Sequence, residues 1–240
     1  MHMMKIQWFR FFYRLQNFFG FNKIIMNKNI NDVSQIMLKS IEKSLWIKLH
    51  SVYFLQNGRH RTRHIISRKN RVAIILYNKP RKVLVFVKQF RPAVYISSIP
   101  ESDQKIGQEI DIKKYPPKLG ITLELCAGLV DKDKSLEEIA KEEIFEECGY
   151  DVPLNSLEKI GSYRCGTGTN SGVQTDFYCE VTDDMKISVG GGIDNELIEV
   201  VEMTVDDVKK YLNQSYLNSP PGFIYCMHWF LYNKVECLCL

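Results

Sequence analysis

The segment from Ser135 to Gly149 constrains the fold more than any other part of the chain. Ser135 followed by Glu138 is a capping-box pattern, and Gly149 suits the position just after a helix end. Together they predict a helix from Ser135 to about Cys148. At 100° per residue, one arc of this helix is apolar and should face a core. The members of that arc are Leu136, Ile139, Ala140 and Ile144.

Three carboxylates interrupt this arc. Glu143 and Glu147 fall inside it, and Glu146 lies beside it. Like charges four residues apart repel, the negative end of the helix dipole disfavours them, and burying charge costs free energy unless it is compensated. A hard divalent cation removes all three penalties, and Mg²⁺ prefers oxygen ligands. We therefore favour a metal site here over the alternative, a solvated acidic face.

The rest of the chain mixes strands and helices. Two apolar, β-branched runs, "RVAIILYN" and "KVLVFVKQF", are joined by "NKPR" and predict a hairpin, and "ITLELCAG" continues with strand character. Further strands are expected at Lys159–Cys165, Thr175–Val181 and Ile198–Thr204, and helices at Val205–Tyr211 and Phe223–Tyr232. Hairpins outnumber βαβ crossovers, which predicts an α/β sandwich around a mixed sheet.

Three segments are expected to lie outside that sandwich. Residues 32–45 suggest a short helix. Residues 46–56 alternate as a strand, "QNG" follows as a hairpin turn, and a partner strand runs through His64–Ser67, so residues 46–70 predict an antiparallel accessory sheet. Residues 97–120 are polar, contain three prolines and show no period. Such an insertion is a lid, a binding arm or a disordered loop.

Composition narrows the class of protein. The net charge of +4 is modest and gives no reason to expect a nucleic-acid partner. Seven scattered cysteines without a CxxC pair favour a reducing cytoplasm, and no apolar run is long enough to span a bilayer. The first 31 residues hold five Lys/Arg, no acid and many aromatics. They fit either a targeting or membrane-surface segment or an extension that makes an oligomer contact.

Residues Gly128–Tyr150, "GLVDKDKSLEEIAKEEIFEECGY", resemble the Nudix box, G-x5-E-x7-R-E-U-x-E-E-x-G-U, where U is aliphatic or aromatic. Two positions depart from that pattern. Lys134 stands where the box has Glu, and Glu142 stands where it has the Arg that helps to orient a metal-binding Glu in this family. The strings "VFVKQFRPAVY", "ELCAGLVD", "CGTGTNSGVQTDFY" and "GGGIDNELIEVVEM" are similar, in that order, to the UDP-sugar diphosphatase branch of the family.

The resemblance implies a Nudix α/β/α sandwich over residues 46–240, with the accessory sheet before it and residues 1–45 as an extension of unknown role. It implies Mg²⁺-dependent hydrolysis, with Mn²⁺ as a second candidate, of the diphosphate bond of a nucleoside-diphosphate sugar. UDP-glucose, giving UMP and glucose 1-phosphate, is the first expectation. It also implies a homodimer. Two alternatives stay open: an ADP-ribose or ADP-sugar diphosphatase, and a Nudix-fold nucleotide-binding module with little turnover.

The resemblance also assigns metal ligands. Glu143, Glu146 and Glu147 are expected to hold Mg²⁺, with Glu146 also counted among the catalytic residues, and the backbone carbonyl of Ala127 is expected to add a ligand. Arg91 is expected to pair with a phosphate, for which its bidentate fork is suited. The alternative for Arg91 is a surface arginine after an edge strand.

Further residues are expected around the substrate. Glu124 is assigned to substrate binding, with a structural hydrogen bond as the alternative. Gly166 and Gly168, in the loop "CGTGTNSG", offer backbone N–H groups to a phosphate or sugar. The general base is expected from the late acidic segment "IDNELIE", with Glu196 favoured and Asp194 second. The alternative for that segment is a solvated acidic loop.

Overall fold

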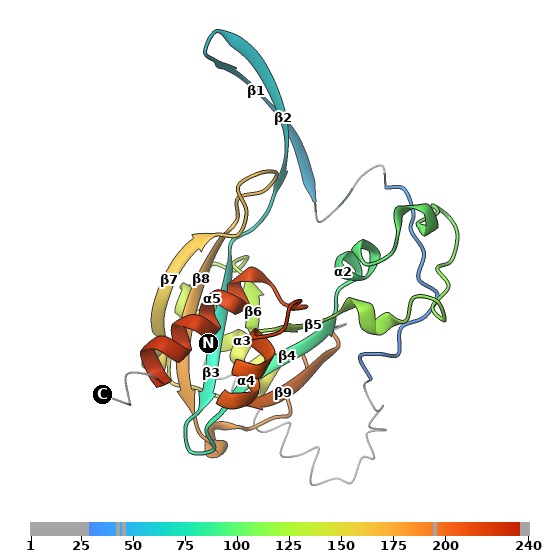
Figure 1. The fold of residues 1–240 in the computed structure, drawn as a ribbon. Helices are drawn as coiled ribbons and strands as arrows, with labels where there is room; N and C mark the ends of the chain where they lie inside the picture. Colours follow the sequence, from blue (N-terminus) through green and yellow to red (C-terminus); the bar gives the residue numbers. More distant parts are fainter. Residues whose placement is uncertain (1–28, 42–43, 45–46, 194–195, 236–240) are drawn as a thin grey trace.

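A computed structural model of the chain describes residues 29–41, 44, 47–193 and 196–235 (Figure 1). Its main sheet has seven strands. They are β3 (Arg71–Asn78), β4 (Val83–Phe90), β5 (Ile121–Glu124), β6 (Cys126–Leu129), β7 (Glu158–Arg164), β8 (Val173–Val181) and β9 (Ile198–Thr204). β3 and β8 pair in parallel, and the other pairs are antiparallel. The expected mixed sheet is confirmed.

The sheet has a helical layer on each face. On one side lie α3 (Leu136–Glu143) and the π-helical turn η3 (Ile144–Cys148). On the other lie α4 (Val205–Leu212) and α5 (Pro221–Phe230), which η6 (Leu231–Val235) continues. Residues of β3 alternate between the two cores: Ile74 packs with the α3 layer and Ile75 with the α5 layer. This is the expected α/β/α sandwich.

The expected strand "ITLELCAG" is two strands with separate partners. β5 pairs with β4, whereas β6 pairs with β3 at Arg71–Ile74. β4 contacts β3 only further along, at Leu76–Asn78, so β4 and β6 share one edge of β3. The chain changes partner at Leu125, between the two strands. Glu124 ends β5 and Ala127 lies on β6, so these two residues flank the change of partner.

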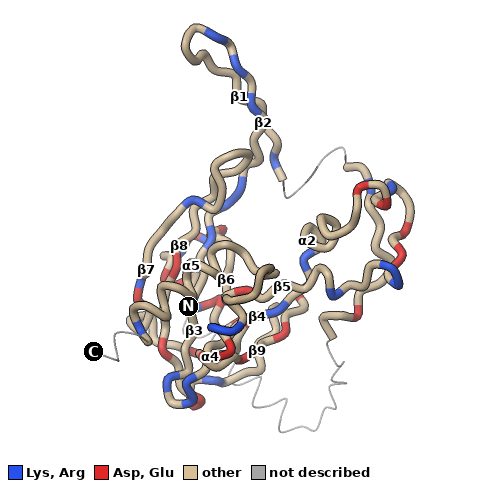
Figure 2. Tube along the Cα trace, viewed as in Figure 1, with Lys and Arg blue, Asp and Glu red and all other residues tan. Residues whose placement is uncertain are grey.

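The accessory sheet is a two-stranded hairpin, β1 (Lys48–Gln56) and β2 (Arg59–Ser67), which projects from the sandwich (Figure 1). Asn57 and Gly58 form its turn with φ of 52° and 70°, the left-handed pair that a type I′ turn requires. All nine residues of β1 are exposed. Lys and Arg positions recur along the hairpin in Figure 2. The predicted turn and strands are confirmed.

The helix expected at residues 32–45 is wrong for the part that the structure describes. Residues 32–41 contain no helical turn; Met37 forms an isolated antiparallel bridge with Glu109. Ile110 N donates to the carbonyl of Ile36 at 2.8 Å, and Gly107 N donates to that of Leu38 at 2.8 Å. An isolated short helix is only marginally stable in water. Long-range backbone partners therefore replace the local hydrogen bonds that a helix would have used.

Those partners belong to the inserted arm, which begins after α2 (Pro92–Ser97) and contains the short 3-10 turns η1 (Glu101–Asp103) and η2 (Pro117–Gly120). Tyr95, Ile99 and Ile110 form a small core of their own. The Tyr95 hydroxyl donates to the carbonyl of Tyr115 at 2.6 Å. The arm is thus a packed unit, not a structureless loop.

Two further 3-10 turns complete the described chain, η4 (Leu154–Ser156) and η5 (Asp183–Met185). None of the helices in the described ranges combines the length and apolar character that crossing a bilayer requires.

Candidate active site

The helix that carries the carboxylates begins and ends as its sequence signals predict. Ser135 Oγ accepts a hydrogen bond from Glu138 N at 3.1 Å, and Ser135 N donates to Glu138 Oε2 at 2.9 Å. Gly149 ends it in the left-handed region, with φ of 81°. The sequence did not reveal that the last turn, Ile144–Cys148, is π-helical. Single π turns within helices are common at functional sites.

Glu147 is the most deeply buried of the three carboxylates. It is only 4% exposed, and its Oε2 accepts a hydrogen bond from Ala127 N at 3.0 Å. Burial raises the pKa of Glu147 to about 8, although the Ala127 hydrogen bond acts in the opposite direction. The contact joins the end of the helix to β6, on which Ala127 lies.

The carboxyl group of Glu143 packs against β6 at Gly128. A Cβ atom at Gly128 would come within 2.0 Å of the Glu143 carboxyl carbon, so a side chain there would displace this carboxylate. Burial, followed by repulsion from Glu146, raises the pKa of Glu143 to about 7. Burial also raises the pKa of Glu146. Glu143 and Glu146 repel each other, and the charge of Glu143 also raises the pKa of Glu147, so the three carboxylates influence one another at the end of the helix. Their role as metal ligands stays a prediction.

A turn of three glycines brings a fourth carboxylate to this group. Gly191 N donates to the carbonyl of Glu147 at 2.8 Å, and Gly192 N donates to that of Glu146 at 3.1 Å. Gly190 has φ of 69°, and a Cβ there would lie 2.2 Å from the Glu147 carbonyl oxygen. Beyond the turn, Glu196 lies close enough to raise the pKa of all three helix carboxylates.

The docking of this glycine turn on the helix was not predicted from the sequence. The available signal was the run of three consecutive glycines, which permits successive left-handed residues. Asp194, the second candidate base, lies outside the described residues.

Arg91 forms a bidentate ion pair with Glu124. Arg91 Nε and Nη2 donate to the two carboxylate oxygens, each at 2.7 Å, and Thr122 Oγ1 donates to Glu124 Oε1 at 2.6 Å. Burial pushes the pKa of Glu124 up, but the hydrogen bonds and charge of Arg91 outweigh it, so the pKa lies below its usual value. Glu124 thus holds the guanidinium of Arg91 in place, and 42% of the Arg91 side chain remains exposed.

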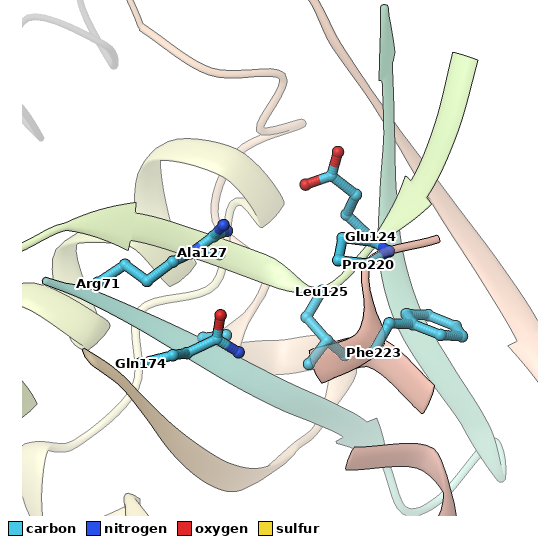
Figure 3. A pocket seen from close by; sticks show the side chains of 8 residues that line it. Arg71, Glu124, Leu125, Ala127, Gln174, Pro220 and Phe223 are labelled. Carbon is cyan, nitrogen blue, oxygen red and sulfur yellow. The ribbon is translucent and has the colours of Figure 1, made fainter. Parts of the chain in front are cut away.

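A small pocket lies on the α5 side of β6, beside these residues (Figure 3). Arg71, Glu124 and Gln174 supply its polar walls, and Phe223 supplies an apolar one. The buried Nε atom of Arg71 has no hydrogen-bond partner among the described atoms. Sequence reasoning missed Arg71 as a site residue. The sequence feature that could have pointed to Arg71 is a positively charged residue at the start of an otherwise largely apolar strand.

The glycine loop between β7 and β8 contacts the hairpin. Ile66 N, on β2, donates to the carbonyl of Thr169 at 2.7 Å. Gly168 borders open space, whereas a Cβ on Gly166 would meet Asn170 Oδ1 at 2.8 Å. The role of Gly166 and Gly168 in substrate binding stays a prediction.

The carboxylates fit a hydrated metal ion better than a rigid protein cage. Among the described residues, no three His, Cys, Asp or Glu side chains are gathered at metal-binding distances. Mg²⁺ is usually held by one or two carboxylates, several waters and substrate phosphates, so a ready-made cage is not needed. Glu147, which is buried, and Glu143, which is half-buried, both have raised pKa values and form an oxygen donor set that a cation would stabilise.

Comparison with known proteins identifies the family. The chain is 35% identical over 208 residues to uridine diphosphate glucose pyrophosphatase NUDT14 of Mus musculus, an alignment that covers 82% of this chain and 93% of the relative. It is 37% identical over 191 residues to the protein of the same name from Bos taurus, covering 75% and 86%. This chain belongs to the Nudix hydrolases.

A bacterial relative carries a different substrate in its name. GDP-mannose pyrophosphatase of Yersinia enterocolitica is 32% identical over 163 residues, covering 66% of this Nudix chain and 74% of the relative. No protein-family model matches the chain.

The two departures of this Nudix hydrolase from the box pattern are partners in the structure. Lys134 Nζ forms an ion pair with Glu142 Oε1. Where the box has an anion followed by a cation, this chain has a cation followed by an anion. The loop and the helix are therefore joined here by a pair whose charges are in the reverse order from the box pattern, and an ionised Glu142 can only accept hydrogen bonds, whereas an arginine would donate them.

Proposed function

We propose that this Nudix hydrolase cleaves the diphosphate bond of nucleoside-diphosphate sugars with Mg²⁺. Its preferred substrate in this proposal is UDP-glucose, which is cleaved to UMP and glucose 1-phosphate. The observation that carries the proposal is the group formed by Glu143, Glu146 and Glu147 at one end of α3, with Glu196 beside it. The names of the mouse and bovine relatives support UDP-glucose.

The residues take distinct roles in this reaction. Glu143, Glu146, Glu147 and the Ala127 carbonyl would hold the cation, which supplies charge neutralisation of the diphosphate and activation of water when it is bound. Mn²⁺ is the alternative cation. Arg91, held by Glu124, pairs with a phosphate oxygen through the exposed part of its side chain.

Glu196 accepts the proton of the attacking water, with Asp194 as the second candidate. The water oxygen forms a bond to one phosphorus while the bond between that phosphorus and the bridging oxygen breaks. The bridging oxygen leaves with the second phosphate. Glu146 would contribute as one of the residues that hold the cation. Gly166 and Gly168 would offer backbone N–H groups to the sugar or a phosphate.

A substrate panel tests this function. Purified chain is assayed with UDP-glucose, ADP-ribose and GDP-mannose, each with Mg²⁺ and with EDTA, and the released UMP, AMP or GMP is quantified. UMP release that depends on Mg²⁺ is the expected result. Faster AMP release makes the protein an ADP-ribose diphosphatase instead. Failure to release any monophosphate would refute an enzymatic role and favour the nucleotide-binding module, for which the exchanged Lys134–Glu142 pair is the supporting feature.

We also propose that the chain works as a cytoplasmic homodimer. Leu49, Tyr53 and Leu55 share one face of β1 and are 73%, 78% and 64% exposed. Large apolar side chains gathered on one exposed face are typical of a protein contact. A second copy of this chain, docking its own hairpin or sandwich there, is the occupant that the family resemblance implies. The five described cysteines are free thiols, which supports a reducing compartment.

A further inference from the structure

Glu142 binds two lysines of the loop that precedes its helix. Lys132 Nζ lies 3.0 Å from Glu142 Oε2, and Lys134 Nζ pairs with Glu142 Oε1. Each carboxylate oxygen therefore has its own lysine. The side chains of Lys134 and Glu142 are 26% and 25% exposed, so this pair is shielded more than an ordinary surface salt bridge. Glu142 is consequently a fixed attachment point for Lys132.

From this attachment, Lys132 reaches the carboxylate group of the proposed metal site. Its Nζ lies 4.0 Å from Glu146 Oε1. Burial has the largest effect on the pKa values of Glu143 and Glu146 and raises both. The charge of Lys132 is among the next largest effects and lowers both pKa values. The ammonium is thus a counter-ion of the carboxylates, while 40% of its side chain stays open to solvent.

A bound cation would change the partners of this ammonium. If Glu146 held a cation, its carboxylate would be shared between that cation and the Lys132 ammonium, and the two positive charges would repel each other. Glu142 would still hold Lys132 beside the carboxylates, where its solvent-exposed part is open to a phosphate that bridges to a metal. A lysine ammonium has three N–H donors on a flexible side chain. It can therefore keep its hydrogen bond to Glu142 and donate a second one to a phosphate oxygen.

We infer that Lys132 has two successive partners: it is the counter-ion of Glu146 in the metal-free protein, and it binds the diphosphate of the substrate once the metal is present. The inference rests on the proposed function. It adds a substrate-binding cation that the Nudix box pattern does not specify, and it gives the exchanged Lys134–Glu142 pair a purpose, since that pair fixes where Lys132 is held.

The two roles predict effects of opposite sign in Lys132→Met. Without the competing ammonium, Mg²⁺ binding to the nucleotide-free chain, measured by titration calorimetry, tightens about threefold, because a positive charge near the ion is gone. The value of kcat/KM for UDP-glucose at saturating Mg²⁺ falls about tenfold, because one charge-assisted hydrogen bond to phosphate is lost. A purely structural role would weaken both.

Two further variants complete the experiment. Lys132→Arg keeps the charge and the reach, so it restores most of kcat/KM and the wild-type Mg²⁺ affinity. Lys209→Met removes an exposed lysine of α4 and leaves both quantities unchanged. The thermal unfolding midpoint of each metal-free variant shows that it is folded before it is compared.

The outcomes separate this inference from the proposed function. Mg²⁺ binding that weakens or stays the same in Lys132→Met overturns the counter-ion role, and an unchanged kcat/KM overturns the phosphate role. Failure of the proposed function shows in the wild-type chain itself, which would then release no nucleoside monophosphate. A wild-type chain that binds no Mg²⁺ in calorimetry overturns both.

Discussion

The carboxylate of Glu147 accepts a hydrogen bond from the backbone N–H of Ala127 at 3.0 Å, joining the last turn of the acidic helix to β6. This contact keeps a buried acid beside a backbone position that is itself a candidate metal ligand. It also couples the helix to the sheet at the point where β4 and β6 share the edge of β3.

Replacing Glu147 by Gln is expected to lower kcat by at least about 100-fold, because the metal loses a charged ligand while Gln still accepts from Ala127 N. The metal-free variant should unfold at the same temperature as the wild type or higher, since a buried ionisable group has been removed. Steady-state kinetics and calorimetric unfolding measure the two effects. Glu137→Gln, on the first turn of the same helix, is the matched control. An unchanged rate in Glu147→Gln would remove Glu147 from the site.

Mg²⁺ is expected to stabilise the folded chain and EDTA to abolish hydrolysis. An ion that binds only the folded state raises the unfolding temperature. Once the ion concentration exceeds the dissociation constant, this increase grows with the logarithm of the concentration. We expect this increase in wild type and its near absence in Glu147→Gln, both measured by thermal unfolding across a Mg²⁺ titration. Equal increases in the two proteins would mean that Mg²⁺ binds elsewhere.

Arg91→Lys is expected to raise KM for the sugar nucleotide about tenfold, because lysine cannot make the bidentate pair that orients the cation toward phosphate. Arg81→Lys is the matched control, since Arg81 also donates two hydrogen bonds to a glutamate, Glu202. The measurement is substrate saturation kinetics at fixed Mg²⁺. If both variants change KM equally, the effect comes from folding and not from Arg91 at the site.

The Arg91–Glu124 pair also predicts a pH dependence of stability. The folded-state pKa of Glu124 lies below its ordinary value of 4.5, so its stabilising contribution is present above that value and is lost as the pH falls through the folded pKa. The difference in unfolding free energy between wild type and Glu124→Gln should therefore be largest near neutral pH and shrink below about pH 4.5. Urea unfolding at a series of pH values tests this. A difference that is constant with pH would contradict it.

Tyr53→Asp is expected to shift the chain from dimer to monomer, because it places a charge on the exposed apolar face of the hairpin. Sedimentation velocity at several concentrations measures the change. Arg63→Gln is the control: it pairs with Val52 and so lies on the opposite face of the same strands. A wild-type chain that sediments as a monomer would already exclude the dimer.

Local signals in the sequence were enough for several elements. The capping box at Ser135, the left-handed end at Gly149 and the hairpin turn at Asn57–Gly58 were all predicted, because each depends on hydrogen bonds or φ angles within a few residues. The same reasoning failed at residues 32–41. There, the backbone bonds to an arm about 70 residues away along the chain, as Ile110 N to the carbonyl of Ile36 shows.

The sequence by itself determined the sandwich layers, the limits of the acidic helix and which of its carboxylates face inward, since hydrophobic period and capping are local properties. Only the tertiary structure decided what those carboxylates meet. Arg91 and Glu124 lie 33 residues apart, and Lys132 reaches Glu146 from a loop. Such pairs form because strand register and the packing of a loop against a helix bring separated residues together, and neither register nor packing is determined by any one segment.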